Sequence, residues 1–239
     1  MSSIQLIHTN DALSTRETDF NHEQHPNSED SGLTAEQLIM EMEHVEPTGI
    51  MTGTSFSTWP LDSLIDYMIK VHHRRVRQNA VIIYNLAEKA AYRHGGTHPN
   101  LPKLVTSLFL FLDDLLHHFK NEEQILFPNI RQLVKTKNYT GKTECTICGL
   151  IKGSTESMRR EHIAIDAELK DFRKLTNDFT PPEDACHCHT DLFTKMEEFE
   201  SDLSLHINLE NEILFPQAIL LVEEYKKQDE NRIDERIFQ

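Results

Sequence analysis

One histidine–glutamate motif occurs twice in the sequence and limits what the chain can fold into. His118-Phe-Lys-Asn-Glu122 and His206-Ile-Asn-Leu-Glu210 are both His-x-x-x-Glu, and both lead into a segment that ends in Ile-Leu-Phe-Pro. The copies are 88 residues apart, from 118 to 206 and from 122 to 210. Residues at i and i+4 share one face of an α-helix, so each motif places an imidazole and a carboxylate within reach of one ion.

Two further histidines extend the repeat. His73 and His162 are 89 residues apart, and each precedes one copy of the motif. The halves therefore look like two copies of one helical hairpin. A single histidine on an apolar face is usually a hydrogen-bonded core residue, but burying four imidazoles and two carboxylates together costs several kcal/mol unless they pair or coordinate metal. The pattern predicts a metal site made by six residues: His73, His118, Glu122, His162, His206 and Glu210.

Apolar residues recur at helical spacing in four stretches, and no stretch alternates as a strand does. We expect helices over about 59–94, from 99 to beyond 125, around 158–172 and around 193–213. The connection between the second and third is expected to be a loop that contains Gly141, Cys145, Cys148 and Gly149. The other connections are fairly short, which predicts an all-α, up-down-up-down four-helix bundle.

The bundle is expected to occupy residues 57–222. Residues 1–56 are rich in polar side chains and are expected to be a largely flexible extension with one helix around 34–45. Residues 223–239 form a charged C-terminal tail that is expected to fray.

Composition excludes several classes of partner. The formal net charge is −15, which argues against a nucleic-acid surface and against anionic membranes. There is no apolar run of about 18 residues and no basic, apolar leader at the N-terminus, so we expect no membrane span and no export. Four cysteines without an export signal are expected to be reduced thiols in a cytoplasmic protein.

The residue types of the six-residue set favour a pair of first-row metal ions. A structural zinc site is usually closed by four ligands that often include thiolates, whereas this set offers six nitrogen and oxygen ligands. Iron fits first, although manganese or a mixed pair fits the same residue types. We expect two non-haem iron ions per chain, each with two imidazoles, bridged by Glu122 and Glu210 and by an oxo group when oxidised.

The motifs resemble those of hemerythrin-like di-iron proteins, and more closely those of the RIC (repair of iron centres) and NorA types. The resemblance covers about 59–220 and rests on Trp59-Pro-Leu, Leu64-Ile-Asp with His73, Glu122-Glu-Gln-Ile-Leu-Phe-Pro128, Met158-x-x-Glu-His162, Thr176-Asn-Asp-Phe-Thr-Pro-Pro182 with Cys186, and the segment from His206 to Pro216. It implies the same six iron ligands, and in the pairs His72-His73 and His117-His118 it selects the second histidine.

Two departures from these families bear on function. Oxygen-carrying hemerythrins have a fifth histidine where this chain has Asp166, and end on His-x-x-x-x-Asp, so oxygen carriage is not expected. Many RIC-type proteins carry an N-terminal pair of adjacent cysteines, whereas residues 1–56 contain no cysteine. The second departure favours the NorA-like interpretation.

The resemblance implies a protein that binds nitric oxide or another small diatomic ligand and protects against nitrosative stress. The alternatives are an iron donor that repairs damaged iron–sulfur clusters, with apo-cluster proteins as partners, and a non-catalytic iron or oxygen sensor. Binding or donation is expected rather than enzymatic turnover.

Several other residues are weaker candidates. Asp114, Glu161 and Asp166 lie near the motif histidines and are candidates for orienting a ligand imidazole, relaying protons or adding a carboxylate. Cys145 and Cys148 are expected at the opposite bundle end from Cys186 and Cys188, so a joint zinc site is not expected. A solvated role is expected for His94, His98, His187 and His189.

Overall fold

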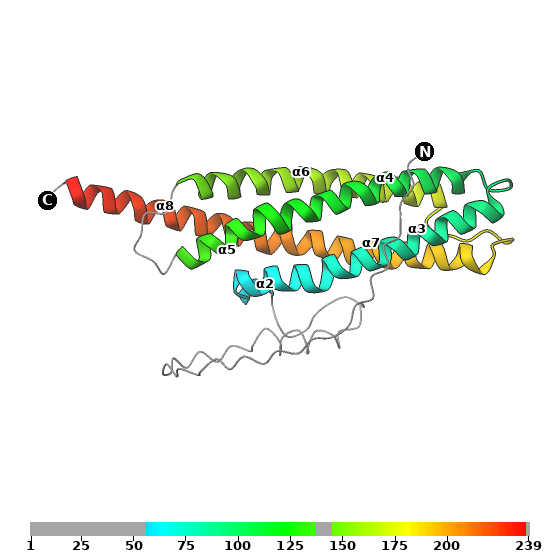
Figure 1. Ribbon diagram of the computed structural model, residues 1–239, viewed down its shortest axis with the longest axis horizontal. Helices are drawn as coiled ribbons and strands as arrows, with labels where there is room; N and C mark the ends of the chain where they lie inside the picture. The colour runs from blue at the N-terminus through cyan, green and yellow to red at the C-terminus, as the bar shows by residue number, and fades with distance from the viewer. Residues whose placement is uncertain (1–55, 137–144, 238–239) are drawn as a thin grey trace, which may run out of the picture.

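Four long helical rods run side by side along the molecule (Figure 1). The computed structural model describes residues 56–136 and 145–237, and the helix expected around 34–45 lies outside them. After a short 3₁₀ turn, Phe56–Thr58, the rods are built from α2 (Leu61–Tyr67) with α3 (Arg74–His94), α4 (Asn100–Asn121) with α5 (Phe127–Thr136), α6 (Cys145–Thr176), and α7 (His187–Leu209) with α8 (Phe215–Ile237).

The order of contacts confirms the predicted bundle. Helix α3 packs against α4 and α7, and α6 packs against α4 and α8, so each rod lies between its two neighbours in an up-down-up-down arrangement. The residues that the structure describes contain no strand.

Two helices are longer than the sequence analysis predicted. Cys148 and Gly149 are helical, because the buried series Cys148, Ile151, Thr155 and Met158 continues the inward stripe of α6 toward its N-terminus. The loop expected at these positions was wrong: Gly149 lies on the exposed side of the helix, where a residue without a side chain is tolerated. Helix α8 likewise continues past residue 222, and Val222 and Tyr225 are buried.

The apolar core is divided into two clusters. One includes Ala87, Leu101 and Phe193, toward the end where α3 turns into α4. The other includes Trp59 and Phe215, toward the end where α6 begins. A layer of buried polar side chains lies between them.

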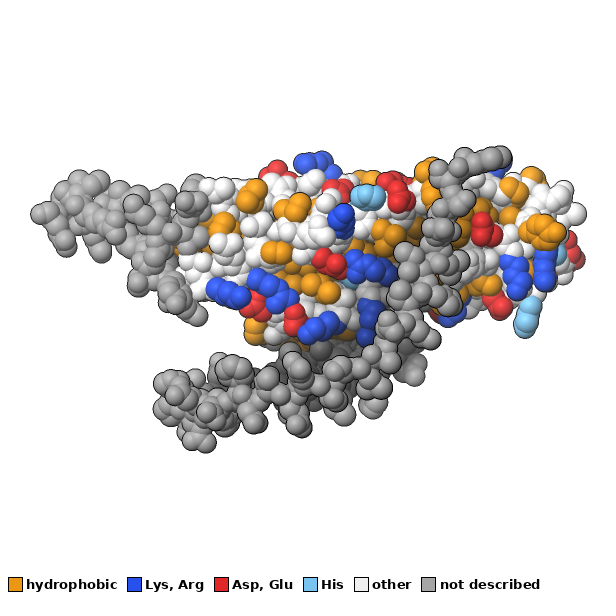
Figure 2. Space-filling view, viewed as in Figure 1, with side chains coloured by type: hydrophobic (Ala, Val, Ile, Leu, Met, Phe, Trp, Pro, Cys, Tyr) orange, Lys and Arg blue, Asp and Glu red, His pale blue; other side chains and the backbone are white. Residues whose placement is uncertain are grey.

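Charged side chains of both signs are interspersed on the face drawn in Figure 2. Arg131 pairs with Asp66, and Lys152 pairs with Glu223. Such pairs between partly exposed side chains add little stability. They keep the outer faces of the helices polar. Within 56–136 and 145–237, no helix has the length and apolar character needed to cross a membrane.

Candidate metal centre

The six residues singled out by the repeat lie together in the buried polar layer. Each is at most 3 % exposed. They form two overlapping groups in which one ligand atom per residue lies within 4.8 Å of the others: His73, Glu122, His206 and Glu210, and His118, Glu122, His162 and Glu210. Both glutamates belong to both groups. Two ions held this way would share their carboxylates.

Three of the rods change to a π-helical turn at this layer, at Met68–His73, Glu122–Leu126 and Glu210–Leu214. The N–H of Phe127 donates to the carbonyl of Glu122, and the N–H of Phe215 donates to that of Glu210, each five residues back. Pro128 and Pro216 follow these turns, and their missing N–H groups cannot continue the ordinary i−4 bonding. Such π turns are frequent at functional sites.

Hydrogen bonds on the outer side fix three of the imidazoles. The Nδ1–H of His73 donates to Glu123 at 2.7 Å, that of His118 to Glu161 at 2.8 Å, and that of His162 to Asn211 at 3.1 Å. In a neutral imidazole the other nitrogen, Nε2, then carries a lone pair. This is the arrangement that orients metal-ligating histidines.

Glu122 faces two histidines with different oxygens. Its Oε2 lies 3.3 Å from Nε2 of His73, and its Oε1 lies 3.1 Å from Nε2 of His118. Oε2 of Glu210 lies 3.2 Å from Nε2 of His162 and 3.5 Å from that of His206. None of the four carboxylate oxygens has a hydrogen-bond partner among the described residues. Buried carboxylates in this condition are costly unless a cation lies between them, so the donor set fits a pair of metal ions.

The pKa values of the buried groups in the metal-free site also indicate that the site favours a cation. Burial raises the pKa of the Glu210 carboxyl well above its ordinary value, and the neighbouring Glu122 adds to the effect. Burial alone would lower the pKa of His118, but the carboxylates of Glu122 and Glu161 together outweigh burial and raise that pKa to about 9. Positive charge is therefore favoured between these groups, and protons or metal cations supply it.

The three further candidates have different positions. Glu161 contacts His118, as described, and Asp114 lies in the same pocket. Asp166 is exposed on α6 and does not line that pocket. Glu123 and Asn211 were not predicted from the sequence, although they occupy equivalent places in the repeat, directly after each motif glutamate.

The two halves of the centre differ in their surroundings. His72 directly precedes the candidate ligand His73 in the first hairpin, just as Glu161 directly precedes His162 in the second. His72 is fully buried, with Nδ1 3.3 Å from Asp202. On this side the ring of His73 also stacks on Phe119 at 4.1 Å, so aromatic rings enclose this half.

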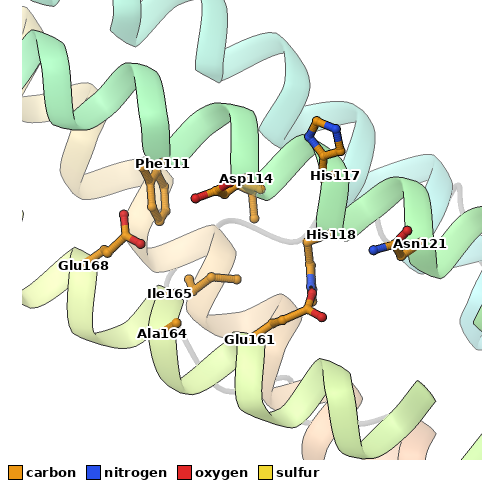
Figure 3. A pocket seen from close by; sticks show the side chains of 10 residues that line it. Phe111, Asp114, His117, His118, Asn121, Glu161, Ala164, Ile165 and Glu168 are labelled. Carbon is orange, nitrogen blue, oxygen red and sulfur yellow. Dashed lines mark hydrogen bonds and ion pairs between the residues drawn. The ribbon is translucent and has the colours of Figure 1, made fainter. Parts of the chain in front are cut away.

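The other half adjoins a pocket of about 320 Å³ between α4 and α6. Figure 3 shows His118 and Glu161 pointing toward one another across it. Asp114 and Glu168 add two more carboxylates, while Phe111 and Ile165 supply apolar surface. The pocket thus joins the exterior to one of the two ligand groups.

The chain matches the family model "Hemerythrin HHE cation binding domain" over residues 64–218. It belongs to the hemerythrin HHE family. This confirms the hemerythrin-like resemblance and makes a non-haem metal ion the expected occupant of the polar layer.

Curated relatives indicate which type of protein within the hemerythrin HHE family this chain resembles. The chain is 35 % identical over 161 residues to the iron-sulfur cluster repair proteins YtfE of Yersinia pseudotuberculosis serotype IB (strain PB1/+) and of Yersinia pestis (strain Pestoides F). The match covers 67 % of this HHE protein and 66 % of each relative, just under two thirds of their length. The predicted likeness to the RIC type is confirmed. The finer NorA-like preference receives no specific support from these relatives.

Proposed function

We propose that this HHE protein holds two iron ions and supplies iron for the repair of damaged iron–sulfur clusters. The six residues of the polar layer would hold the ions, and Glu122 and Glu210, which belong to both ligand groups, would be available to each of them. The relatives' name, iron-sulfur cluster repair protein, supports the activity. It was the alternative in the sequence analysis, and it now replaces nitric oxide binding as the main hypothesis.

The pocket beside His118 carries this proposal. A protein that gives up iron needs a polar path from the ligands to the exterior, and Asp114, Glu161 and Glu168 line such a path. Carboxylates favour a hydrated cation, and their net negative charge raises its local concentration. His118 lines this path and His162 lies beside it, so an ion bound by these two histidines would leave first.

The test is transfer of iron from the loaded protein to an apo iron–sulfur protein. The loaded full chain is mixed anaerobically with the apo acceptor, sulfide and a thiol reductant, and cluster formation is followed by absorption and by recovered acceptor activity. Faster recovery than with an equal amount of free ferrous iron and chelator supports donation. A protein that retains its iron while the acceptor stays inactive contradicts it.

Nitric oxide binding is the second candidate, and the apolar part of the pocket favours it. Phe111, Leu115 and Ile165 form an apolar wall of the pocket, along which a small neutral molecule can reach His118. Ferrous iron with an open coordination position binds nitric oxide. A saturable ferrous-nitrosyl EPR signal without loss of iron, together with failure of the transfer test, would move the assignment to nitric oxide binding.

A further inference from the structure

Two buried histidines do not belong to the six-residue set. His189, in the first turn of α7, is 1 % exposed, so the solvated role expected for it is wrong. His72 is fully buried directly before His73, and neither of its ring nitrogens has a hydrogen-bond partner among the described residues. A buried imidazole without partners is costly. The position of His72 beside the metal centre indicates a role there.

His206 is the candidate ligand whose imidazole lacks an outer partner. The other three imidazoles donate Nδ1–H outward, whereas neither nitrogen of His206 has a hydrogen-bond partner in the described part of the chain. Its Nε2 faces Oε2 of Glu210 at 3.5 Å, which leaves Nδ1 for a group on the outer side. A metal-bound imidazole almost always donates this second N–H, so we expect an acceptor for Nδ1 close to the ring.

The rings of Phe119, His73 and His72 contact the ring of His206. Phe119 has no acceptor atom, and both nitrogens of His73 already face glutamates. Of these three neighbours, only His72 therefore has a nitrogen available to accept the Nδ1–H of His206.

The distance between the two rings fits such a bond after a small movement. The centroids of His72 and His206 are 5.8 Å apart. Two imidazoles joined by an N–H···N hydrogen bond of about 2.9 Å have centroids roughly 5.2 Å apart, so a shift of about 0.6 Å is enough. Hydrogen bonds at a site are often long before its ligand binds and tighten in the complex.

The internal repeat gives a second argument. Glu161, in the second hairpin, hydrogen-bonds to His118, the motif histidine of the first hairpin. His72 has the equivalent position in the first hairpin, directly before its first candidate ligand, and it contacts His206, the motif histidine of the second hairpin. Residues at equivalent places in the two copies thus reach equivalent histidines, which predicts the same role for both.

Asp202 fixes the orientation of His72. Oδ1 of Asp202 lies 3.3 Å from Nδ1 of His72, and the Arg75 guanidinium donates to the same oxygen at 3.2 Å. A carboxylate at this place favours the proton on Nδ1 of His72 and leaves the lone pair on Nε2. The ring of Tyr67 packs edge-on against His72, with the centroids 5.0 Å apart.

We propose that His72, oriented by Asp202, is a positioning residue for the metal centre. It accepts the Nδ1–H of His206 and so keeps Nε2 of His206 directed at the ion. The inference rests on the two-iron centre proposed above and concerns the ion bound by His73 and His206. The two ions then have different outer partners, because His118 donates to a carboxylate and His206 to an imidazole backed by a carboxylate.

Iron retention by variants of His72 tests this role. His72→Phe keeps a ring beside Tyr67 but has no acceptor, whereas His72→Gln keeps an acceptor oxygen and a donor for Asp202. Each full chain is loaded with iron anaerobically, and iron per chain is measured against a graded chelator series. We expect His72→Phe to bind one of its two irons about tenfold or more weakly than the wild type, and His72→Gln to restore most of the retention.

Urea unfolding of the metal-free proteins separates this role from packing. The phenyl ring has no unpaired nitrogen to bury, so metal-free His72→Phe should be at least as stable as the metal-free wild type. His187→Phe, at an exposed histidine of α7, is the matched control and should keep both irons. Asp202→Asn should release the same iron several-fold more readily, and it decides the test if His72→Phe fails to fold.

The outcomes distinguish the role of His72 from the metal centre itself. Two irons held equally tightly by wild type, His72→Phe and Asp202→Asn overturn the role of His72 and leave the centre standing. Equal loss of iron from His72→Gln and His72→Phe also overturns it, because an acceptor at this place then makes no difference. A wild type that binds no iron overturns both the centre and the role.

Discussion

The Nε2 atoms of His118 and His162 lie 3.2 Å apart in the middle of the bundle. Both rings donate Nδ1–H outward, to Glu161 and to Asn211, so two lone pairs face one another unless a cation or a proton lies between them. The geometry of this pair depends on its outer partners as much as on the two histidines.

Loss of the Glu161 carboxylate should weaken metal binding. Glu161→Gln keeps the size of the side chain but removes the charge that makes His118 a better ligand, and such outer partners are worth about 10–100-fold in metal affinity. Iron retention against a graded chelator series measures the change. Glu156→Gln, on the exposed side of the same helix, is the control, and equal retention by the two variants would contradict the role given to Glu161.

The pocket carboxylates should control how fast iron leaves. Asp114→Asn combined with Glu168→Gln removes two negative charges from the pocket lining without touching a candidate ligand. We expect unchanged iron content and transfer to an apo-cluster acceptor slowed several-fold, with a weaker dependence on salt concentration. Asp113→Asn, next to Asp114 but outside the lining, should transfer iron at the wild-type rate. A double variant as fast as this control would rule out the pocket as the path.

The central glutamates should destabilise the metal-free protein. Replacing buried charged groups by apolar residues of similar volume is often stabilising by about 1–4 kcal/mol. The variant Glu122→Leu with Glu210→Leu should therefore bind no iron, yet unfold at a higher urea concentration than the metal-free wild type. The iron-loaded wild type should be more stable than its own metal-free form. A metal-free double variant that is less stable than the metal-free wild type would show that these glutamates contribute structure without metal.

The sequence predicted the bundle and gathered the six residues because helical periodicity decides which side chains share a face. An i, i+4 pair such as His118 and Glu122 needs no tertiary information to be placed on one side of a helix. Glu123 was missed because it is five residues after His118, a spacing that faces away in a regular α-helix. The π turn that begins at Glu122 changes this register.

Contacts between segments that are distant in the sequence could not be predicted from its pattern either. The burial of His189 follows from how the start of α7 lies against the end of α3, and no local spacing encodes that arrangement. The same holds for Asp202, which is close to His72 only because α7 packs beside the first rod. Residues that helix packing brings together without a repeated motif, unlike the six central residues, were the ones that sequence reasoning could not place.

The π turns themselves can be tested through Pro128. This proline is exposed, and its missing N–H leaves the carbonyl of Gln124 without its ordinary i+4 donor, inside the turn Glu122–Leu126. Pro128→Ala restores the donor and favours a regular α-helix, which should stabilise the metal-free protein by up to about 3 kcal/mol. It should also turn Glu122 and Glu123 away from their present partners and so weaken iron binding.

Pro102→Ala is the control, because Pro102 lies in the first turn of α4, where the N–H has no intrahelical partner. Urea unfolding of the metal-free proteins and chelator competition of the loaded ones measure the two effects. A Pro128→Ala protein with greater stability and undiminished iron affinity would show that the metal centre does not require the π turn.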